Sequence, residues 1–134
     1  MKIIIDCNIW ISWLIGHQIQ ALRQILLDPH VDVYVCDALL DEIREVVNRE
    51  KIRKYVGEAE IKDMFHLINA FCIYANIEIE AKVDVRDPKD LYLFSFAESI
   101  NATYIVSGDN DLLAVKQYKS TRILKLAEFK EMYL

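Results

Sequence analysis

The chain opens with Lys2-Ile3-Ile4-Ile5-Asp6-Cys7-Asn8, an apolar run that stops at an acidic residue. Three consecutive β-branched residues favour a strand, and a strand that is apolar on both faces is typical of the interior of a parallel sheet. In an open α/β sheet, ligands bind beyond the carboxyl ends of the strands. We therefore expect Asp6 at the functional edge of the sheet, although an Asp there could also simply end the strand.

Further strand and helix patterns alternate along the rest of the chain. Besides the opening run, strands are expected at residues 31–36, 77–80, 103–107 and 122–126. Helices are expected at about 9–27, 37–50, 58–74, 87–100, briefly after residue 111, and from about 127. Asp37 and Asp87 are the expected N-caps, with Pro88 at the first helical position. The alternation predicts a three-layer α/β/α fold around a parallel sheet with right-handed crossovers.

Composition limits the class of protein. With 134 residues, 54% hydrophobic and 28% charged, the chain is expected to form one folded domain over residues 1–134 rather than a disordered segment. The net charge of −5 argues against general binding to polyanions, but it allows a local basic patch or a site where metal ions supply positive charge. The high apolar content suggests a homodimer, with residues 58–74 and the pair Trp10 and Trp13 as candidate surfaces.

Cysteine usage and hydropathy favour a cytoplasmic location. Cys7, Cys36 and Cys72 form no C-x-x-C pair, so a disulfide framework is not expected and a reducing cytoplasm is favoured. We see no signal-peptide pattern, and the longest near-apolar run, residues 9–15, is far shorter than the ~20 residues that a membrane helix needs. Neither secretion nor membrane insertion is expected.

Carboxylates from four separate segments are expected at one edge of the sheet. Asp6 ends the first strand, and Glu42 lies in the second turn of the helix after the second strand. Asp90 lies in the first turn of the helix that Pro88 opens, and Asp109 and Asp111 follow the strand at 103–107. Such a cluster repels itself unless a cation is bound, and oxygen ligands suit Mg²⁺ or Mn²⁺ better than Zn²⁺.

Each of these residues also has an ordinary structural role. A carboxylate such as Glu42 or Asp90 can be solvated or can complement the helix dipole. Asp109 and Asp111 lie in a Gly-Asp-Asn turn, where Asp is common for conformational reasons. Two polar residues after the first strand are candidate supporting groups, with helix capping or packing as the alternatives: Asn8 and Ser12.

Four short motifs, in this order, resemble those of PIN-domain ribonucleases of the VapC toxin type. Ile3 to Ser12 is similar to the family's apolar strand, Asp-x-Asn and later Ser, with Cys7 where Thr is more usual. Residues 39–43 and 86–90 are similar to its second and third acidic motifs, the latter followed by Ala97. Residues 104–113 are similar to its fourth motif.

The resemblance implies a Rossmann-like sheet of about five parallel strands and Mg²⁺- or Mn²⁺-dependent cleavage of single-stranded RNA. It also implies dimerisation and often a cognate antitoxin as partner. The catalytic, metal-binding carboxylates would be Asp6, Glu42, Asp90 and Asp109, with Asp111 as the alternative fourth ligand and Asn8 and Ser12 in support. Metal ions so held would activate water and offset phosphate charge.

Three matters stay open at this point. A haloacid-dehalogenase-like phosphatase also has an Asp after its first strand, but its chemistry normally wants a second Asp at position 8, where this chain has Asn. A PIN-like scaffold that only binds partners is a non-enzymatic alternative. Substrate-binding residues are not identified. The candidates to hold the RNA backbone form a basic group that is better explained as a solvated helix face: Arg44, Arg49, Lys51, Arg53 and Lys54.

Overall fold

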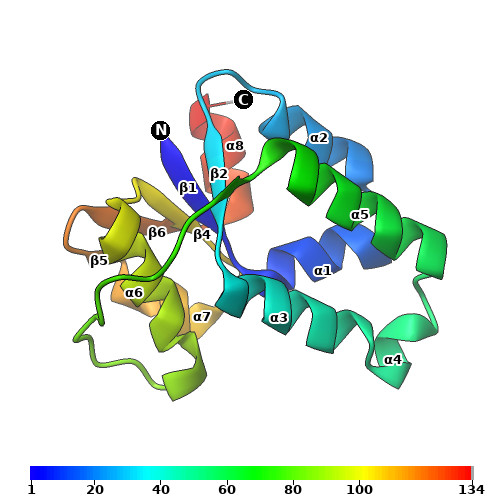
Figure 1. Ribbon diagram of the computed structural model, residues 1–134. Helices are drawn as coiled ribbons and strands as arrows, with labels where there is room; N and C mark the ends of the chain where they lie inside the picture. The colour runs from blue at the N-terminus through cyan, green and yellow to red at the C-terminus, as the bar shows by residue number, and fades with distance from the viewer. Residues whose placement is uncertain (134) are drawn as a thin grey trace.

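The computed structural model describes residues 1–133, which form a six-stranded sheet in the order β3-β2-β1-β4-β6-β5 (Figure 1). Five strands are parallel to one another, and β5 joins the edge in the antiparallel sense. The strands are β1 (Lys2–Ile5), β2 (Asp32–Val35), β3 (Ile73–Tyr74), β4 (Tyr104–Val106), β5 (Gln117–Tyr118) and β6 (Thr121–Leu124). The predicted five-stranded parallel α/β sheet is confirmed, with one short strand added.

Helices cover both faces of this sheet. They are α1 (Cys7–Ile15), α2 (Ile19–Leu26), α3 (Asp37–Val47), α4 (Glu50–Arg53), α5 (Glu58–Phe71), α6 (Leu91–Ile100), α7 (Asn110–Val115) and α8 (Leu126–Tyr133), with a 3₁₀ turn at Pro88–Asp90. Helix α1 packs against α2, α3 and α5, whereas α6 packs on β1 and β4 (Figure 1). The three-layer arrangement follows from right-handed crossovers that run in opposite directions from the central strand.

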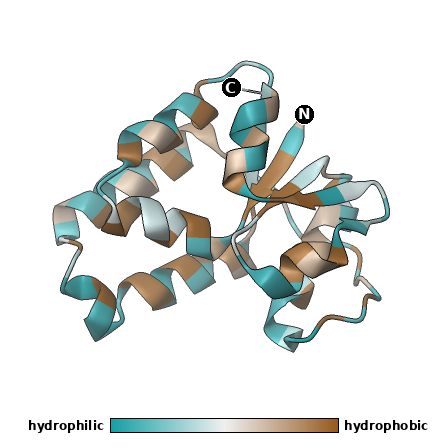
Figure 2. Cartoon of the chain, turned by 180° about the vertical axis from the view of Figure 1, so that it is seen from behind, coloured by the Kyte–Doolittle hydropathy of each residue, from teal (hydrophilic) through white to brown (hydrophobic). Residues whose placement is uncertain are grey.

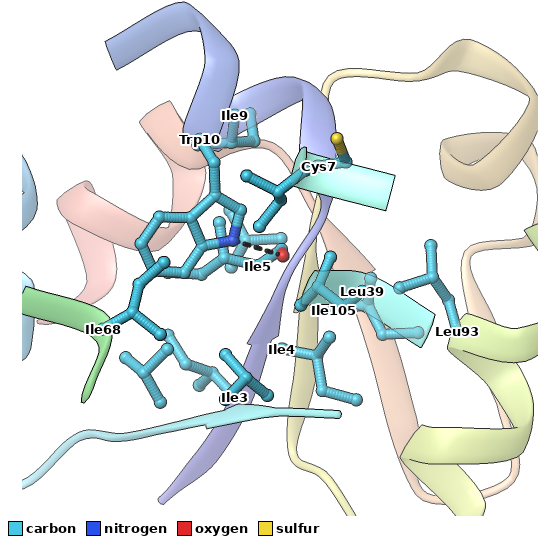
Figure 3. Close-up of a cluster of buried hydrophobic side chains, with 14 of the residues drawn as sticks. Ile3, Ile4, Ile5, Cys7, Ile9, Trp10, Leu39, Ile68, Leu93 and Ile105 are labelled. Atoms are coloured by element: carbon cyan, nitrogen blue, oxygen red, sulfur yellow. Dashed lines mark hydrogen bonds between the residues drawn. The ribbon is translucent and has the colours of Figure 1, made fainter. Parts of the chain in front are cut away.

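The first strand forms the centre of the core. Ile3, Ile4 and Ile5 are fully buried, and each contributes roughly 1.5–3 kcal/mol through burial. Trp10 and Trp13 are also buried, with ring centroids 5.7 Å apart, and the Trp10 indole N–H donates to the Ile5 carbonyl at 2.9 Å (Figure 3). The interpretation of these tryptophans as an oligomer surface is therefore wrong. Figure 2 shows hydrophobic residues along β1, inside the molecule.

The expected helix over 9–27 is two helices. Asp6 caps α1, so the helix begins at Cys7, and Gly16 ends it with its N–H bonded to the Ser12 carbonyl. His17 then has a φ of 53°, a left-handed conformation that cannot continue a helix. The chain therefore turns back, and α2 packs beside α1 rather than extending it.

The predicted N-cap at Asp37 is also wrong. Cys36 occupies the cap position, and the Asp37 carboxylate accepts a hydrogen bond of 2.7 Å from the Tyr74 hydroxyl in β3. The expected helix over 37–50 ends at Val47, and α4 follows as a separate turn. At Asp87 the prediction is confirmed, because its carboxylate caps the turn at Lys89 N.

The strand expected at residues 77–80 is not formed. The strand at this edge is β3, at Ile73–Tyr74, which the sequence pattern had assigned to the preceding helix. Residues 77–80 run alongside α6 instead, and the backbone N–H groups of Glu78 and Ile79 both bond to the Ser99 hydroxyl at 2.9 Å. Side-chain hydroxyls thus replace the sheet ladder that the alternating pattern suggested.

No helix within residues 1–133 has both the length and the apolar character needed to cross a membrane.

Candidate active site

Asp6 lies where the central strand ends. Its backbone N–H continues the sheet by bonding to the Val106 carbonyl at 2.9 Å. One carboxylate oxygen, Oδ1, accepts from the Cys7 N–H at 2.7 Å, and Oδ2 accepts from the Ser107 hydroxyl at 2.8 Å. The side chain is buried, with 6% of its surface exposed. Asp6 is therefore a fixed carboxylate at the carboxyl edge of β1.

Three further carboxylates share a cavity with Asp6. Glu42 comes from α3, Asp90 from the 3₁₀ turn, and Asp109 from the N-cap of α7. The cavity has a volume of about 360 Å³, and its lining residues are Asp6, Cys7, Asn8, Ile11, Ser12, Ile15, Glu42, Val46, Arg49, Asp90 and Asp109. The structure thus brings together four of the five carboxylates that the sequence placed at this edge.

Asp111 does not line the cavity. Its backbone N–H bonds to Asp109 Oδ1, so Asp109 also caps α7, while the Asp111 carboxylate lies 3.6 Å from the Arg86 guanidinium. The two candidate supporting residues do line the cavity, yet the Ser12 hydroxyl donates to the Ile9 carbonyl of its own helix at 2.8 Å. For Ser12 the structure shows the packing role that the sequence also allowed.

Two of the cavity carboxylates hold their protons unusually tightly. Burial is the main cause that raises the pKa of Asp6 to about 6, and the charges of Glu42 and Asp109 add to it. The pKa of Asp90 also rises to about 6, through partial burial and then through Asp6 and Asp109. Mutual repulsion and desolvation of this kind would both be relieved by a bound cation.

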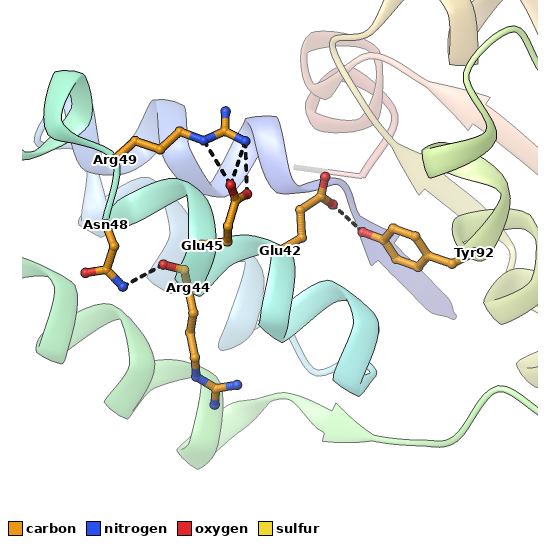
Figure 4. A network of polar contacts seen from close by, with 6 residues as sticks. All are labelled: Glu42, Arg44, Glu45, Asn48, Arg49 and Tyr92. Carbon is orange, nitrogen blue, oxygen red and sulfur yellow. Dashed lines mark hydrogen bonds and ion pairs between the residues drawn. The ribbon is translucent and has the colours of Figure 1, made fainter.

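Two cavity-lining residues, Glu42 and Arg49, each bond to a side chain outside the cavity (Figure 4). The Tyr92 hydroxyl reaches from α6 to donate a hydrogen bond of 2.5 Å to Glu42 Oε1. Burial and the Glu42 carboxylate together raise the pKa of the Tyr92 hydroxyl, so it remains a donor. The Arg49 guanidinium donates hydrogen bonds of 2.9 to 3.3 Å to the Glu45 carboxylate.

The donor set fits a hard divalent cation, because every charged acceptor in the cavity is a carboxylate oxygen. Within residues 1–133, no three His, Cys, Asp or Glu side chains already stand close enough together to hold a metal ion. Side chains that repel one another spread apart, so closure onto an ion requires rotation of Glu42, Asp90 or Asp109 around the fixed Asp6.

Sequence reasoning missed two residues of this site. Ser107 is fully buried, follows β4 directly and donates to the Asp6 carboxylate. A serine directly after a buried strand is a sequence signal that could have identified it as a supporting residue. Tyr92 lies 50 residues from Glu42, and no local pattern links the two. Of the five basic residues considered above, only Arg49 lines the cavity in the described part of the chain.

Comparison with known proteins agrees with this fold. A family model described as the PIN domain matches residues 2–111. A chain of the VapBC2 crystal structure from Rickettsia felis, bound to a DNA fragment from its promoter, superposes with a TM-score of 0.60 at 12% identity, over 92% of this chain and 97% of that one. No curated protein matches the chain. The family match over most of the sequence, together with the shared fold, shows that this chain belongs to the PIN-domain family.

Proposed function

We propose that this protein is an endoribonuclease that hydrolyses phosphodiesters of single-stranded RNA with the help of Mg²⁺ or Mn²⁺. The observation that carries the proposal is the convergence of Asp6, Glu42, Asp90 and Asp109 on one cavity, where two of the carboxylates have pKa values raised to about 6. Carboxylates that share one partly buried cavity in a folded protein favour a site that binds cations.

These carboxylates would hold the ion from four sides of the cavity. When bound, a divalent ion supplies a hydroxide-like water and neutralises charge on the phosphate in the transition state. Asp6 has the most restricted carboxylate, because both of its oxygens accept hydrogen bonds from buried groups. It would therefore orient the other ligands, and its loss is expected to be the most damaging.

A negatively charged chain needs a local cation to receive the polyanion. Arg49 lies on the cavity wall beside the acidic residues, and its side chain is 47% exposed. Its guanidinium can exchange the Glu45 carboxylate for an RNA phosphate group, since carboxylate and phosphate both accept two hydrogen bonds from one guanidinium. We assign Arg49 the role of binding a backbone phosphate of the RNA.

Partners follow from the same proposal. The structurally similar VapBC2 is bound to a DNA fragment from its promoter. With the resemblance of the four motifs to VapC-type toxins, this leads us to propose a cognate antitoxin and a cytoplasmic setting for this chain. We also propose a homodimer, since exposed apolar residues follow one another at the end of α5, in β3 and in the segment after it: Phe71, Ile73, Tyr74, Ile77 and Ile79. Light scattering that gives 15.7 kDa at tens of micromolar would contradict the dimer.

The test of the proposed activity is a fluorescent panel of single-stranded RNAs. Wild type and Asp6→Asn are purified side by side, with Asp87→Asn as control because Asp87 is an N-cap outside the cavity. We expect cleavage that EDTA stops and Mn²⁺ restores, and a rate for Asp6→Asn lower by ~10²-fold or more. Equal cleavage by wild type and Asp6→Asn would place the activity elsewhere.

Absence of cleavage by any variant, with or without Mn²⁺, would favour a PIN scaffold that only binds partners. The phosphatase alternative is disfavoured by membership of the PIN-domain family and by Asn8. Trapping a phosphoenzyme on Asp6 would be the result that supports it.

A further inference from the structure

One hydrogen bond joins Glu42, which lines the acidic cavity, to a tyrosine outside it. The Tyr92 hydroxyl on α6 donates to Glu42 Oε1 on α3 across 2.5 Å (Figure 4). The two residues are 50 positions apart, and both are half-buried. Within residues 1–133, Glu42 Oε2 receives no hydrogen bond, so one oxygen of this carboxylate is held while the other is free.

Tyr92 also faces the segment that precedes the 3₁₀ turn. It lines a second cavity, of about 480 Å³, whose other walls come from the segment at 77–80 and the start of α6. That segment is tied to α6 by two serine hydroxyls, because Ser99 accepts from Glu78 and Ile79 and Ser95 accepts from Ala81 N at 2.9 Å. Tyr92 is thus carried by α6, and the segment across this second cavity is bonded to the same helix without involving Glu42.

A hydroxyl with one proton to donate fixes the carboxylate that receives it. Among the cavity carboxylates, Asp6 is fixed by Cys7 and Ser107, whereas Glu42 stands on a longer side chain with more rotamers. Without a partner, Glu42 would turn away from the charges of Asp6 and Asp90. The Tyr92 hydrogen bond keeps it on the cavity wall and offsets part of its charge.

We propose that Tyr92 is a positioning residue for the metal centre, whose hydroxyl presents the free oxygen of Glu42 to the cation. This role rests on the proposed function, since it needs a cation in the cavity. In this role Tyr92, which is not one of the four carboxylates, contributes to the affinity of the cavity for the ion. Hydrogen bonds to ligating groups generally change metal affinity by 10- to 100-fold.

The test compares Tyr92→Phe with Tyr118→Phe in the full chain. Tyr118 is a matched control, because its hydroxyl also donates to a carboxylate, Glu98, at 2.9 Å, away from the acidic cavity. Mn²⁺ alone is titrated by calorimetry and by electron paramagnetic resonance. We expect about tenfold weaker Mn²⁺ binding for Tyr92→Phe and wild-type binding for Tyr118→Phe. Equal affinity of Tyr92→Phe and wild type would overturn the proposal.

A second pair of variants shows whether the hydroxyl acts through Glu42. In a Glu42→Ala background no carboxylate remains to be held, so adding Tyr92→Phe should not change Mn²⁺ affinity further. The same tenfold loss in both backgrounds would mean that Tyr92 acts by another route, and the proposal would fail. A wild-type chain that binds no Mn²⁺ would give a different result, which removes the proposed metal centre and this role together.

Discussion

The hydroxyl of Ser107 donates to Asp6 Oδ2 at 2.8 Å while it accepts from the backbone N–H of Asp109 at 3.0 Å. Ser107 follows β4 and Asp6 follows β1, and these two strands are neighbours in the sheet. One buried hydroxyl therefore sets the relative position of two of the cavity carboxylates. A site built in this way depends on a residue that does not itself line the cavity.

Replacing Ser107 by Ala is expected to destabilise the protein by about 1–3 kcal/mol at pH 8, because a buried, ionised Asp6 loses a donor. The same change should raise the pKa of Asp6 further, since the Ser107 hydrogen bond lowers it. Urea unfolding gives the free energy. Ser12→Ala is the control, because the Ser12 hydroxyl bonds only to its own helix, and an equal loss in both variants would contradict this account.

The stability of the metal-free protein should fall as pH rises through the range of about 4 to 6. Asp6 holds its proton more tightly in the folded chain, with a pKa of about 6 against 3.8, so ionisation there disfavours folding. At pH 8 the full penalty is about 3 kcal/mol, an upper bound. Asp6→Asn should therefore unfold at higher urea than wild type at pH 8, and the two should converge near pH 4.

An Asp6→Asn variant that is less stable than wild type at pH 8 would assign Asp6 a structural role instead. In that case its hydrogen bonds to Cys7 and Ser107 would outweigh the cost of its buried charge. Both curves are measured in EDTA so that adventitious cations do not stabilise the wild type.

Added Mg²⁺ or Mn²⁺ is expected to raise the melting temperature of the wild type. A ligand that binds only the folded chain stabilises it by about 2.7 kcal/mol at one hundred times its Kd. The increase should be much smaller in Asp90→Asn, which removes a cavity carboxylate, and unchanged in Asp87→Asn, which alters only the cap. Equal increases in all three proteins would mean that the ions bind elsewhere.

The fold was predictable where a local pattern and the tertiary contacts agree. The run Ile3-Ile4-Ile5 gave the central strand because burial on both faces requires such a sequence. The prediction failed where partners are distant. Residues 77–80 alternate like a strand, yet the Ser99 hydroxyl of α6 bonds to the backbone N–H groups of Glu78 and Ile79. The strand β3 lies earlier in the chain, at Ile73–Tyr74, where the Tyr74 hydroxyl donates to Asp37.

The site residues were likewise predictable only where local sequence and strand order place them. Strand ends and helix starts place Asp6, Glu42, Asp90 and Asp109 at one edge from topology alone, and the structure finds them around one cavity. Tyr92 meets Glu42 only because the tertiary fold brings the start of α6 to the side of α3, and no local sequence pattern links residues 50 positions apart. For Trp10 and Trp13 the sequence suggests an oligomer surface, but the fold buries both side chains in the core.

Asp109 and Asp111 should separate clearly as ligands. Asp109 lines the cavity, whereas the Asp111 carboxylate faces Arg86. We expect Asp109→Asn to weaken Mn²⁺ binding and to lower the cleavage rate by ~10²-fold, while its amide oxygen still caps α7. Asp111→Asn should change neither quantity. The opposite order, in Mn²⁺ titration and RNA cleavage alike, would make Asp111 the ligand.

Arg49 should govern the apparent affinity for RNA. It lines the cavity and pairs with Glu45, whereas Arg44 on the same stretch of chain pairs with Asp41 and does not line it. Arg49→Ala is expected to raise KM with little change in kcat and to reduce the salt dependence of RNA binding by about one charge, because one phosphate contact is lost. Arg44→Ala should leave both near wild type.

Glu45→Gln provides the reverse change, at the partner of Arg49. Glu45 competes with RNA phosphate for the Arg49 guanidinium, so its neutralisation should free Arg49 and lower KM. The effect should disappear when Arg49 is Ala, because no cation remains to be released. Fluorescence anisotropy of a short single-stranded RNA, measured from 50 to 200 mM salt in EDTA, reports binding apart from cleavage. If Arg49→Ala and Arg44→Ala weaken binding equally, the contribution is general surface charge, and Arg49 has no specific role in holding the substrate.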